Sequence, residues 1–202
     1  RIAAGRRMRQ HPVQSRARYE SPLALLDDYE KLARRLGIDR MVFVQPSAYG
    51  TDNSCMLDAM RKVGDAARGI VDISEDAPDT LIEALHQQGV RGVRINTSPI
   101  APYDPARIDE LIPRIEKLAH RLTGTGWCLE FLGPGWLTEA LTPVMRRLPV
   151  DVIVDHMGMF LARDGVDQPG FRALLDLTGA GHVWIKLTGV YRASQASGLS
   201  DA

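Results

Sequence analysis

The sequence predicts an α/β protein of the (β/α)8 barrel (TIM-barrel) type, and two observations support this. Short apolar segments alternate six times with amphipathic segments, at about the ~30 residues of a βα repeat. Most of the apolar segments are near-continuous, which is typical of parallel strands buried on both faces. A closed barrel needs about 250 residues and the chain has 202, so we expect an incomplete barrel with strands two to seven of eight.

The competing architecture is a doubly wound open sheet. Against it, no predicted strand is followed by a Gly-x-Gly-x-x-Gly turn or by a phosphate-binding loop. The predicted strands are Met41–Gln45, Arg68–Ile73, Val90–Asn96, Trp127–Phe131, Val150–Val154 and His182–Leu187. The predicted helices are 21–36, 52–63, 78–88, 104–122, 135–147 and 171–178.

Two helices carry further expectations. The first is opened by Pro22 and capped by Gly37, and the helix over 104–122 contains Pro113, a residue that kinks helices. Residues 1–20 are predicted to be an arm or loop, and 21–202 to be the barrel domain. The apolar face of the first helix is expected to consist of Leu25, Leu26, Tyr29, Leu32, Ala33 and Leu36.

Composition limits the classes of function. The 25 basic and 25 acidic side chains balance, which gives no reason to expect nucleic acid or a membrane surface as a partner. No apolar run approaches the ~20 residues of a membrane helix. The two cysteines lack the paired spacing of a disulfide framework or zinc site, so we expect a cytoplasmic protein. The sequence leaves open whether the protein forms a homo-oligomer.

Both ends of the chain look cut. It starts at Arg1 rather than at a methionine, and it stops at Ser200-Asp201-Ala202, which is a helix-capping pattern with no helix behind it. We therefore expect a segment of a longer protein.

His156 is the strongest candidate for chemistry. The apolar run Val150–Val154 ends at Asp155-His156, and Gly158 follows as a turn residue. In α/β barrels ligands bind beyond the carboxyl ends of the strands. A histidine there can act as an acid or base, polarise a carbonyl or bind a metal. The alternative is a histidine satisfied within a loop.

Strand alternation divides the arginines of Val90–Asn96. If Arg94 faces the barrel interior, Arg91 has the opposite parity and is expected to be a structural cap or an ion pair. Arg94 lies near the end of its strand, where a guanidinium group can bind a substrate carboxylate through two hydrogen bonds. A buried salt bridge within the barrel is an equally weighted alternative.

The same alternation applies to other polar residues. Lys186 is expected to face the interior with an ionic partner, because burial destabilises an isolated ammonium group. Asp155 has the opposite parity to His156 and is expected to orient neighbouring backbone. Ser47 has no visible histidine–aspartate partner and is not interpreted as a nucleophile. Asp52 and Asn53 are expected to form a turn and helix cap.

Four motifs carry a family resemblance. In order along the chain they are the segments 45–53 (QPSAYGTDN), 89–94 (GVRGVR), 155–158 (DHMG) and 186–192 (KLTGVYR). Together they resemble the amidohydrolase-2 branch of the amidohydrolase superfamily, and most closely its pyrone-dicarboxylate hydrolases and related lactonases. The resemblance covers about Tyr19 to Ser194.

The resemblance implies a function and two further barrel strands that the given sequence does not contain. It implies hydrolysis of a small carboxylated lactone or cyclic ester, such as 2-pyrone-4,6-dicarboxylate. A strand with a His-x-His pair should precede Arg1, and a strand with a catalytic aspartate should follow Ala202. The alternatives are a metal-dependent amidohydrolase or decarboxylase of the same superfamily, or an inactive fragment without these strands.

The resemblance also implies residue roles. His156 would hydrogen-bond the scissile carbonyl without a metal, or would bind zinc or manganese in a metal-dependent relative. Glu130 is a second possible ligand, with an interior polar group as its alternative. The predicted strand 127–131 has no histidine, unlike many metal-dependent relatives, so no cofactor is expected.

The resemblance also implies that Arg192 binds a substrate carboxylate, with a solvated loop arginine as the alternative. Ser47 and Tyr49 follow the predicted strand 41–45 and could donate hydrogen bonds to the same anion. For the segment from Tyr49 to Asn53 the equal alternative is a turn and helix cap. The expected partner is therefore a small-molecule carboxylate.

Overall fold

The computed structural model describes residues 25–97 and 100–194. The chain divides into two compact units, residues 1–92 and 93–202, and each is described by itself. The predicted arm at 1–20 and the first residues of the predicted helix 21–36 lie outside the described residues.

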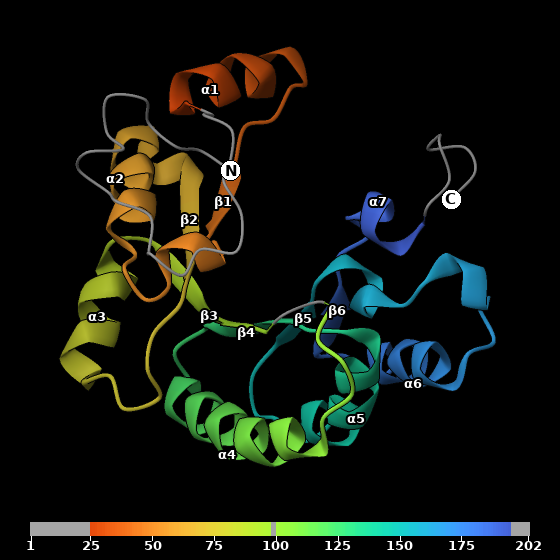
Figure 1. Cartoon of the computed structure of the whole chain (residues 1–202). Coiled ribbons are helices and arrows are strands. Elements are labelled where there is room, and N and C mark those ends of the chain that lie inside the picture. Colours follow the sequence, from red (N-terminus) through yellow and green to blue (C-terminus); the bar gives the residue numbers. More distant parts are fainter. Residues whose placement is uncertain (1–24, 98–99, 195–202) are drawn as a thin grey trace. The chain divides into compact units, whose positions relative to one another are not determined.

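The first unit alternates helices and strands (Figure 1). Strands β1 and β2 pair in parallel, with Met41 opposite Ala67 and Val44 opposite Ile70. Each strand is followed by a helix, as the sequence predicts. The elements are α1 (Leu26–Arg35), β1 (Met41–Val44), η2 (Ser47–Tyr49), α2 (Ser54–Val63), η3 (Gly64–Ala66), β2 (Ala67–Val71), α3 (Asp79–Gln87) and the start of β3 (Val90–Asn96).

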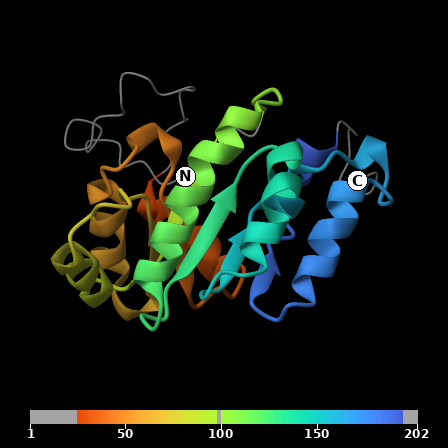
Figure 2. The same cartoon turned by 90° about the horizontal axis from the view of Figure 1, so that it is seen from below.

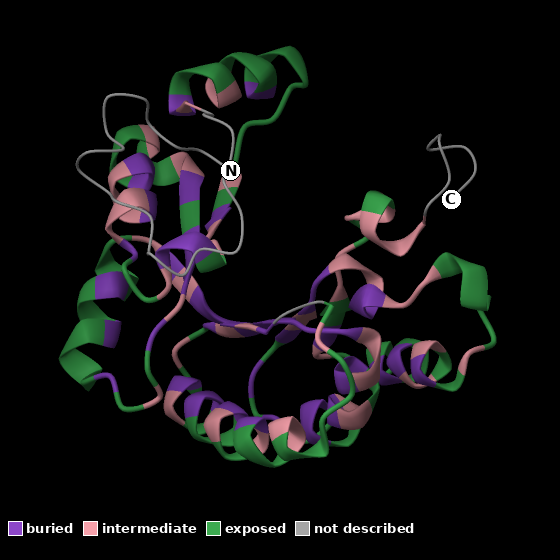
Figure 3. Ribbon diagram, in the orientation of Figure 1, coloured by how far each residue is buried: buried purple, intermediate pink, exposed green. Residues whose placement is uncertain are grey.

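Helix α1 buries less of its apolar face than the sequence predicts (Figure 3). Leu26 and Ala33 are buried, whereas Leu32 is 48% and Leu36 63% exposed. Leu26 and Ala33 are seven residues apart, so they lie two helical turns apart in one narrow row. The predicted residues share one side of the helix, but among the described residues only part of that apolar face is buried.

The second unit continues the alternation. Strands β4, β5 and β6 pair in parallel, with Leu129 opposite Val152 and Val152 opposite Val183. Strand β3 is the neighbour of β4. The elements are α4 (Pro105–Leu122), β4 (Cys128–Leu132), α5 (Gly135–Met145), β5 (Val152–Val154), η4 (His156–Met159), η5 (Ala162–Asp164), α6 (Pro169–Thr178), β6 (Val183–Ile185) and α7 (Val190–Ala193).

The three long helices of the second unit lie on one face of its strands (Figures 1 and 2). Helix α5 packs between α4 and α6. Side chains of one parity in β3 and β4, such as Val93 and Phe131, are buried and apolar. Arg94 and Glu130 have the other parity and meet each other on the opposite face. Helices on one face only are typical of a barrel and argue against the doubly wound alternative.

No helix among residues 25–97 and 100–194 is long and apolar enough to cross a bilayer. Pro113 lies inside α4, as predicted. The short helix α7 was not predicted, because four residues are too few to show an apolar period.

Candidate active site

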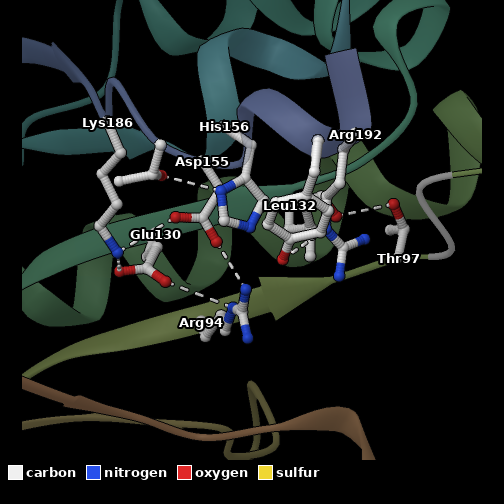
Figure 4. Close-up of polar contacts among 10 residues, drawn as sticks. Arg94, Thr97, Glu130, Leu132, Asp155, His156, Lys186 and Arg192 are labelled. Atoms are coloured by element: carbon white, nitrogen blue, oxygen red, sulfur yellow. Dashed lines mark hydrogen bonds and ion pairs between the residues drawn. The ribbon is translucent and has the colours of Figure 1, made fainter. Parts of the chain in front are cut away.

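Four charged side chains gather at the carboxyl ends of the strands of the second unit (Figure 4). Arg94 comes from β3 and Glu130 from β4, while Asp155 and Lys186 directly follow β5 and β6. Parallel strands bring these ends to one edge of the sheet. The four residues thus reach the same place although 92 positions separate the first from the last.

The four residues form a closed ion network, in which each cation contacts both carboxylates. Arg94 Nη2 lies 2.5 Å from Asp155 Oδ2, and Arg94 Nε lies 3.3 Å from Glu130 Oε1. Lys186 Nζ lies 3.1 Å from Asp155 Oδ1 and also donates to Glu130 Oε2. The two carboxylate side chains are only 1% and 2% exposed. The network therefore balances two buried negative charges with two positive ones.

The ion network decides between alternative roles that the sequence left open for several residues. Arg94 forms the buried salt bridge, and Glu130 is the interior polar group that contacts its neighbours. Lys186 has the ionic partners predicted for it. The role predicted for Asp155, orienting neighbouring backbone, is wrong for its side chain, which binds Arg94 and Lys186 instead. Arg91, as expected of a cap, donates to the backbone oxygens of His86 and Val90.

The two carboxyl groups differ in their protonation. Burial alone would raise the pKa of Asp155, but Arg94 and Lys186 outweigh burial and hold the pKa below its ordinary value. Burial raises the pKa of Glu130, the neighbouring Asp155 adds to the rise, and Lys186 and Arg94 only partly offset it. Asp155 is thus the carboxylate that keeps its charge more firmly.

His156 begins a turn with unusual backbone geometry. His156, Met157 and Met159 have φ angles of 51°, 54° and 61°, and Gly158 between them has φ 69°. Side chains with a Cβ rarely adopt this left-handed region, and such strain gathers at functional sites. The turn breaks the strand alternation directly after Asp155. Consecutive residues Asp155 and His156 can therefore both serve the same site, which strand parity alone does not predict.

The turn is anchored on both sides. The Met157 N–H donates to the Lys186 carbonyl at 3.1 Å, and the Thr138 hydroxyl donates to the Gly158 carbonyl at 3.0 Å. Thr138 belongs to α5 and is fully buried. These bonds satisfy backbone groups that a left-handed turn would otherwise leave unpaired.

The imidazole of His156 rests against the segment that follows β6. Its Nδ1 lies 2.8 Å from Thr188 Oγ1. A Cβ on Gly189 would lie 2.8 Å from both Cγ and Nδ1 of the ring, so only glycine leaves room for it. Gly189 also has φ +72°, which favours glycine.

His156 is held in its neutral form. Burial lowers the pKa of the imidazole below its ordinary value of 6.5, and the charges of Arg192, Arg94 and Lys186 lower it further. Only Asp155 opposes them. A neutral imidazole carries one N–H donor and one acceptor nitrogen, which suits carbonyl polarisation or proton transfer.

Arg192 projects from α7 beside His156 (Figure 4). Its backbone N–H donates to the Gly189 carbonyl at 2.7 Å. Its guanidinium lies 5.6 Å from the centre of the exposed Tyr191 ring. Figure 4 shows Arg94, Arg192 and His156 in the same small region, so the structure brings these three predicted residues together. Their contacts with substrate stay predictions.

Ser47 and Tyr49 belong to the first unit. They lie in η2, where Ser47 is exposed and Tyr49 is buried. The nearby Asp52 and Asn53 form the predicted turn: the Ser54 N–H donates to Asp52 Oδ1, and Asn53 Nδ2 donates to the Thr51 carbonyl. Asn53 is the N-cap residue of α2, but it makes no side-chain capping hydrogen bond, so the predicted helix cap is not formed by its side chain. The substrate-binding role of Ser47 and Tyr49 stays a prediction.

Glu130 is the second residue that the sequence offers as a metal ligand. Both of its carboxylate oxygens lie against cations, Arg94 and Lys186. In the described ranges no three His, Cys, Asp or Glu side chains are grouped to hold a metal. The expectation that no cofactor is required stays a prediction.

Sequence reasoning missed Thr188 and Gly189, which lie against the imidazole of His156. Thr188 and Gly189 lie within the motif 186–192, but the sequence predicts no role for either of them. The signal was the Thr-Gly pair directly after the Lys186 strand end, at the same sheet edge as His156. Adjacent strand ends in a parallel sheet bring such loops into contact.

Comparisons with known proteins identify the family of the chain. The sequence profile of the amidohydrolase-2 family, described as amidohydrolase, matches residues 3–202. The chain belongs to this family. A 4-sulfomuconolactone hydrolase from Rhizobium radiobacter is 33% identical over 186 residues, which cover 92% of this chain and 60% of that protein. A 2-pyrone-4,6-dicarboxylate hydrolase from Comamonas testosteroni is 33% identical over 159 residues, covering 78% of this chain and 50% of that protein.

Solved structures show the same fold. A Pseudomonas putida protein described as a candidate 2-pyrone-4,6-dicarboxylic acid hydrolase matches with a TM-score of 0.81 and 32% identity, over 97% of this chain and 68% of that one. An amidohydrolase from Burkholderia multivorans, solved with bound zinc, matches with a TM-score of 0.63 and 17% identity, over 84% of this chain and 60% of that one, which shows the fold alone. The predicted family and α/β barrel-type fold are confirmed. The chain spans about 60% of the length of the first curated relatives it matches.

Proposed function

We propose that this chain forms part of a hydrolase that opens small carboxylated lactones without a metal ion. The observation that carries the proposal is a neutral His156 on a strained left-handed turn, beside Arg192 and above a closed ion network. The names of the lactone-acting relatives support the substrate class.

His156 would act on the lactone carbonyl. Attack of water on this carbonyl places negative charge on its oxygen, and an N–H donor fixed in place stabilises that charge. The ring is fixed by Thr188 and by the space at Gly189, so it needs little rearrangement during the reaction. We assign activation of the water to a group outside the described residues, as the family resemblance implies.

Arg192 would bind a substrate carboxylate. Its side chain is only partly buried and stacks on Tyr191, so a small anion can approach it. Arg94, in contrast, already contacts Asp155 and Glu130. We therefore assign Arg192 the larger share of anion binding, and Arg94 a mainly electrostatic influence on the site.

The test uses the natural full-length protein with 2-pyrone-4,6-dicarboxylate and 4-sulfomuconolactone as substrates. Arg192→Ala should raise KM about 10- to 100-fold, because a charge-assisted hydrogen bond contributes about 1.5–3 kcal/mol. His156→Asn should lower kcat about 100- to 1000-fold, the usual loss of an oxyanion donor. Arg163→Ala, which removes an exposed arginine of η5, serves as the control.

Two results would contradict the proposal. The first is an Arg192→Ala protein that binds and hydrolyses both lactones like wild type. The second is stoichiometric zinc or manganese in the purified protein, with activity lost on chelation and restored by the metal; this result would favour the metal-dependent alternative. The same assay on residues 1–202 alone tests the alternative of an inactive fragment.

The proposed location is the cytoplasm, where cysteines remain reduced. Cys55 and Cys128 both carry thiols in this structure, which supports this location. The proposed partner is the small carboxylated substrate, and the balanced charge gives no reason to add nucleic acid or a membrane.

A further inference from the structure

The hydrogen bonding of His156 is one-sided. Its Nδ1 lies 2.8 Å from Thr188 Oγ1, and Nε2 has no hydrogen-bond partner among residues 25–97 and 100–194. The Thr188 hydroxyl in turn has Nδ1 as its sole partner in the same part of the chain. The two groups are therefore matched to each other, and Nε2 is the nitrogen left for a substrate.

The segment around Thr188 is built to keep this contact. Gly189 follows in a left-handed conformation, and the ring occupies the space where a Cβ would lie. On the other side, the backbone N–H of Met157 is bound to the Lys186 carbonyl. The imidazole and the hydroxyl are thus joined through neighbouring strand ends, with little freedom to separate.

The direction of the hydrogen bond determines what the histidine can do. If the hydroxyl donates to Nδ1, the single proton of the neutral ring lies on Nε2, which can then donate to a carbonyl oxygen. If Nδ1–H donates to the hydroxyl, Nε2 presents a lone pair and can only accept a proton. In the second case the hydroxyl proton would have no protein acceptor among the described residues.

We propose that Thr188 is a positioning residue for His156: its hydroxyl donates to Nδ1 and keeps the imidazole proton on Nε2, where it meets the lactone carbonyl. The choice of tautomer rests on the proposed function, whereas the Thr188–His156 contact does not. Thr188 acts through the histidine and makes no contact with substrate.

The test combines spectroscopy with kinetics on the full-length protein. Histidine ring 15N shifts report which nitrogen carries the proton, and the His156 signals are assigned by their loss in His156→Asn. The variants are Thr188→Val, which keeps the side-chain shape without the hydroxyl, and Thr188→Ser, which keeps the hydroxyl. Thr178→Val removes an exposed hydroxyl at the end of α6 and serves as the control.

Wild type should show the proton on Nε2 in the absence of substrate. Thr188→Val should give a mixture of both tautomers and lower kcat about 10- to 100-fold, the usual cost of losing a group that orients a functional histidine. KM should change less than about twofold, because the substrate carboxylate contacts are untouched. Thr188→Ser should restore both the tautomer and kcat.

Two findings would overturn the inference: a wild-type ring with its proton on Nδ1, or a Thr188→Val protein with an unchanged tautomer and kcat. The spectra need no substrate, so they separate this inference from the proposed function. A protein that shows the Nε2–H form and its loss in Thr188→Val, yet hydrolyses no lactone, would support the positioning role and contradict lactone hydrolysis.

Discussion

Different kinds of interaction hold the segments at the strand ends of the two units. After β1 and β2, neutral amide side chains bind backbone groups: Gln45 Nε2 donates to the Gly50 and Asp52 carbonyls at 2.9 and 2.8 Å. Asn53 exchanges hydrogen bonds with the backbone of Asp72, at 2.9 and 3.0 Å. After β3 to β6, charged side chains bind one another, and His156 lies beside them.

This difference shows that a polar residue at a strand end is not by itself a functional residue. The amide nitrogens of Gln45 and Asn53 bind backbone carbonyls and so hold the loops that follow the strands. In the second unit the ion network holds the strand ends instead. This arrangement leaves His156 Nε2 without a hydrogen-bond partner in the described part of the chain.

The largest expected effect comes from breaking the ion network. Asp155→Ala should lower the free energy of unfolding by about 3–5 kcal/mol, because it leaves Arg94 and Lys186 with an uncompensated buried charge. Urea denaturation measures this loss. Asp58→Ala removes the exposed pair with Arg61 and should cost no more than about 1 kcal/mol. Equal losses in the two variants would remove the distinction between the buried network and a surface pair.

The next effect concerns the space beside Gly189 that the imidazole of His156 occupies. Gly189→Ala should lower kcat about 100-fold, because a Cβ there displaces the ring and a misplacement of about 1 Å costs that much. It should also lower the free energy of unfolding by about 1–2 kcal/mol through its left-handed backbone.

Gly165→Ala is the control for backbone strain. Gly165 also has a positive φ, +76°, but its ψ is 175° where that of Gly189 is 29°, a region still less open to residues with a Cβ. Apart from its chain neighbours, no heavy atom lies within 4 Å of the position that a Cβ would take at Gly165. Gly165→Ala should therefore lose at least as much stability from backbone strain, while only Gly189→Ala should lose kcat. A Gly165→Ala protein with the same loss of kcat would show that backbone strain, rather than the ring contact, is responsible.

Much of the fold could be predicted because it depends on local periodicity. The six strands follow apolar runs, and α4 follows a clear apolar period despite Pro113. Strand parity also placed Arg94 and Lys186 on the interior face, since alternation is fixed by the backbone. These features need no knowledge of distant contacts.

The remaining features depend on geometry that the sequence does not display. The left-handed turn at His156 is formed mostly by residues with a Cβ, so a search for glycines does not predict where its positive φ angles begin. Parity consequently separated Asp155 from His156, although both act in one site. The exposure of Leu32 and Leu36 in α1 likewise depends on which side of the helix meets other elements, which an apolar face alone does not determine.

A smaller effect is expected from the amides of the first unit. Asn53→Ala should lower the free energy of unfolding by about 1–3 kcal/mol, because the backbone N–H and carbonyl of Asp72 lose their partner. Urea denaturation measures the change. Asn53→Asp should recover none of it, because a carboxylate oxygen would face the Thr51 and Asp72 carbonyls in place of the amide donor. A change below about 0.5 kcal/mol would contradict the structural role assigned to this amide.

The smallest expected effect is a shift in the pH at which His156 takes up a proton. Burial and the charges of Arg192, Arg94 and Lys186 lower its pKa, and Asp155 alone raises it. Because the neutral ring is the proposed active form, kcat/KM should stay level as pH falls through 6.5 and decline only at the lower folded-state pKa. The unfolded chain binds this proton at a higher pH than the folded protein, so stability should also fall as pH drops from 6.5 towards the folded-state pKa. Arg192→Gln removes one cation and should move the histidine titration, followed by NMR, to higher pH. A titration that stays in place would place Arg192 too far from the ring to share a substrate with it.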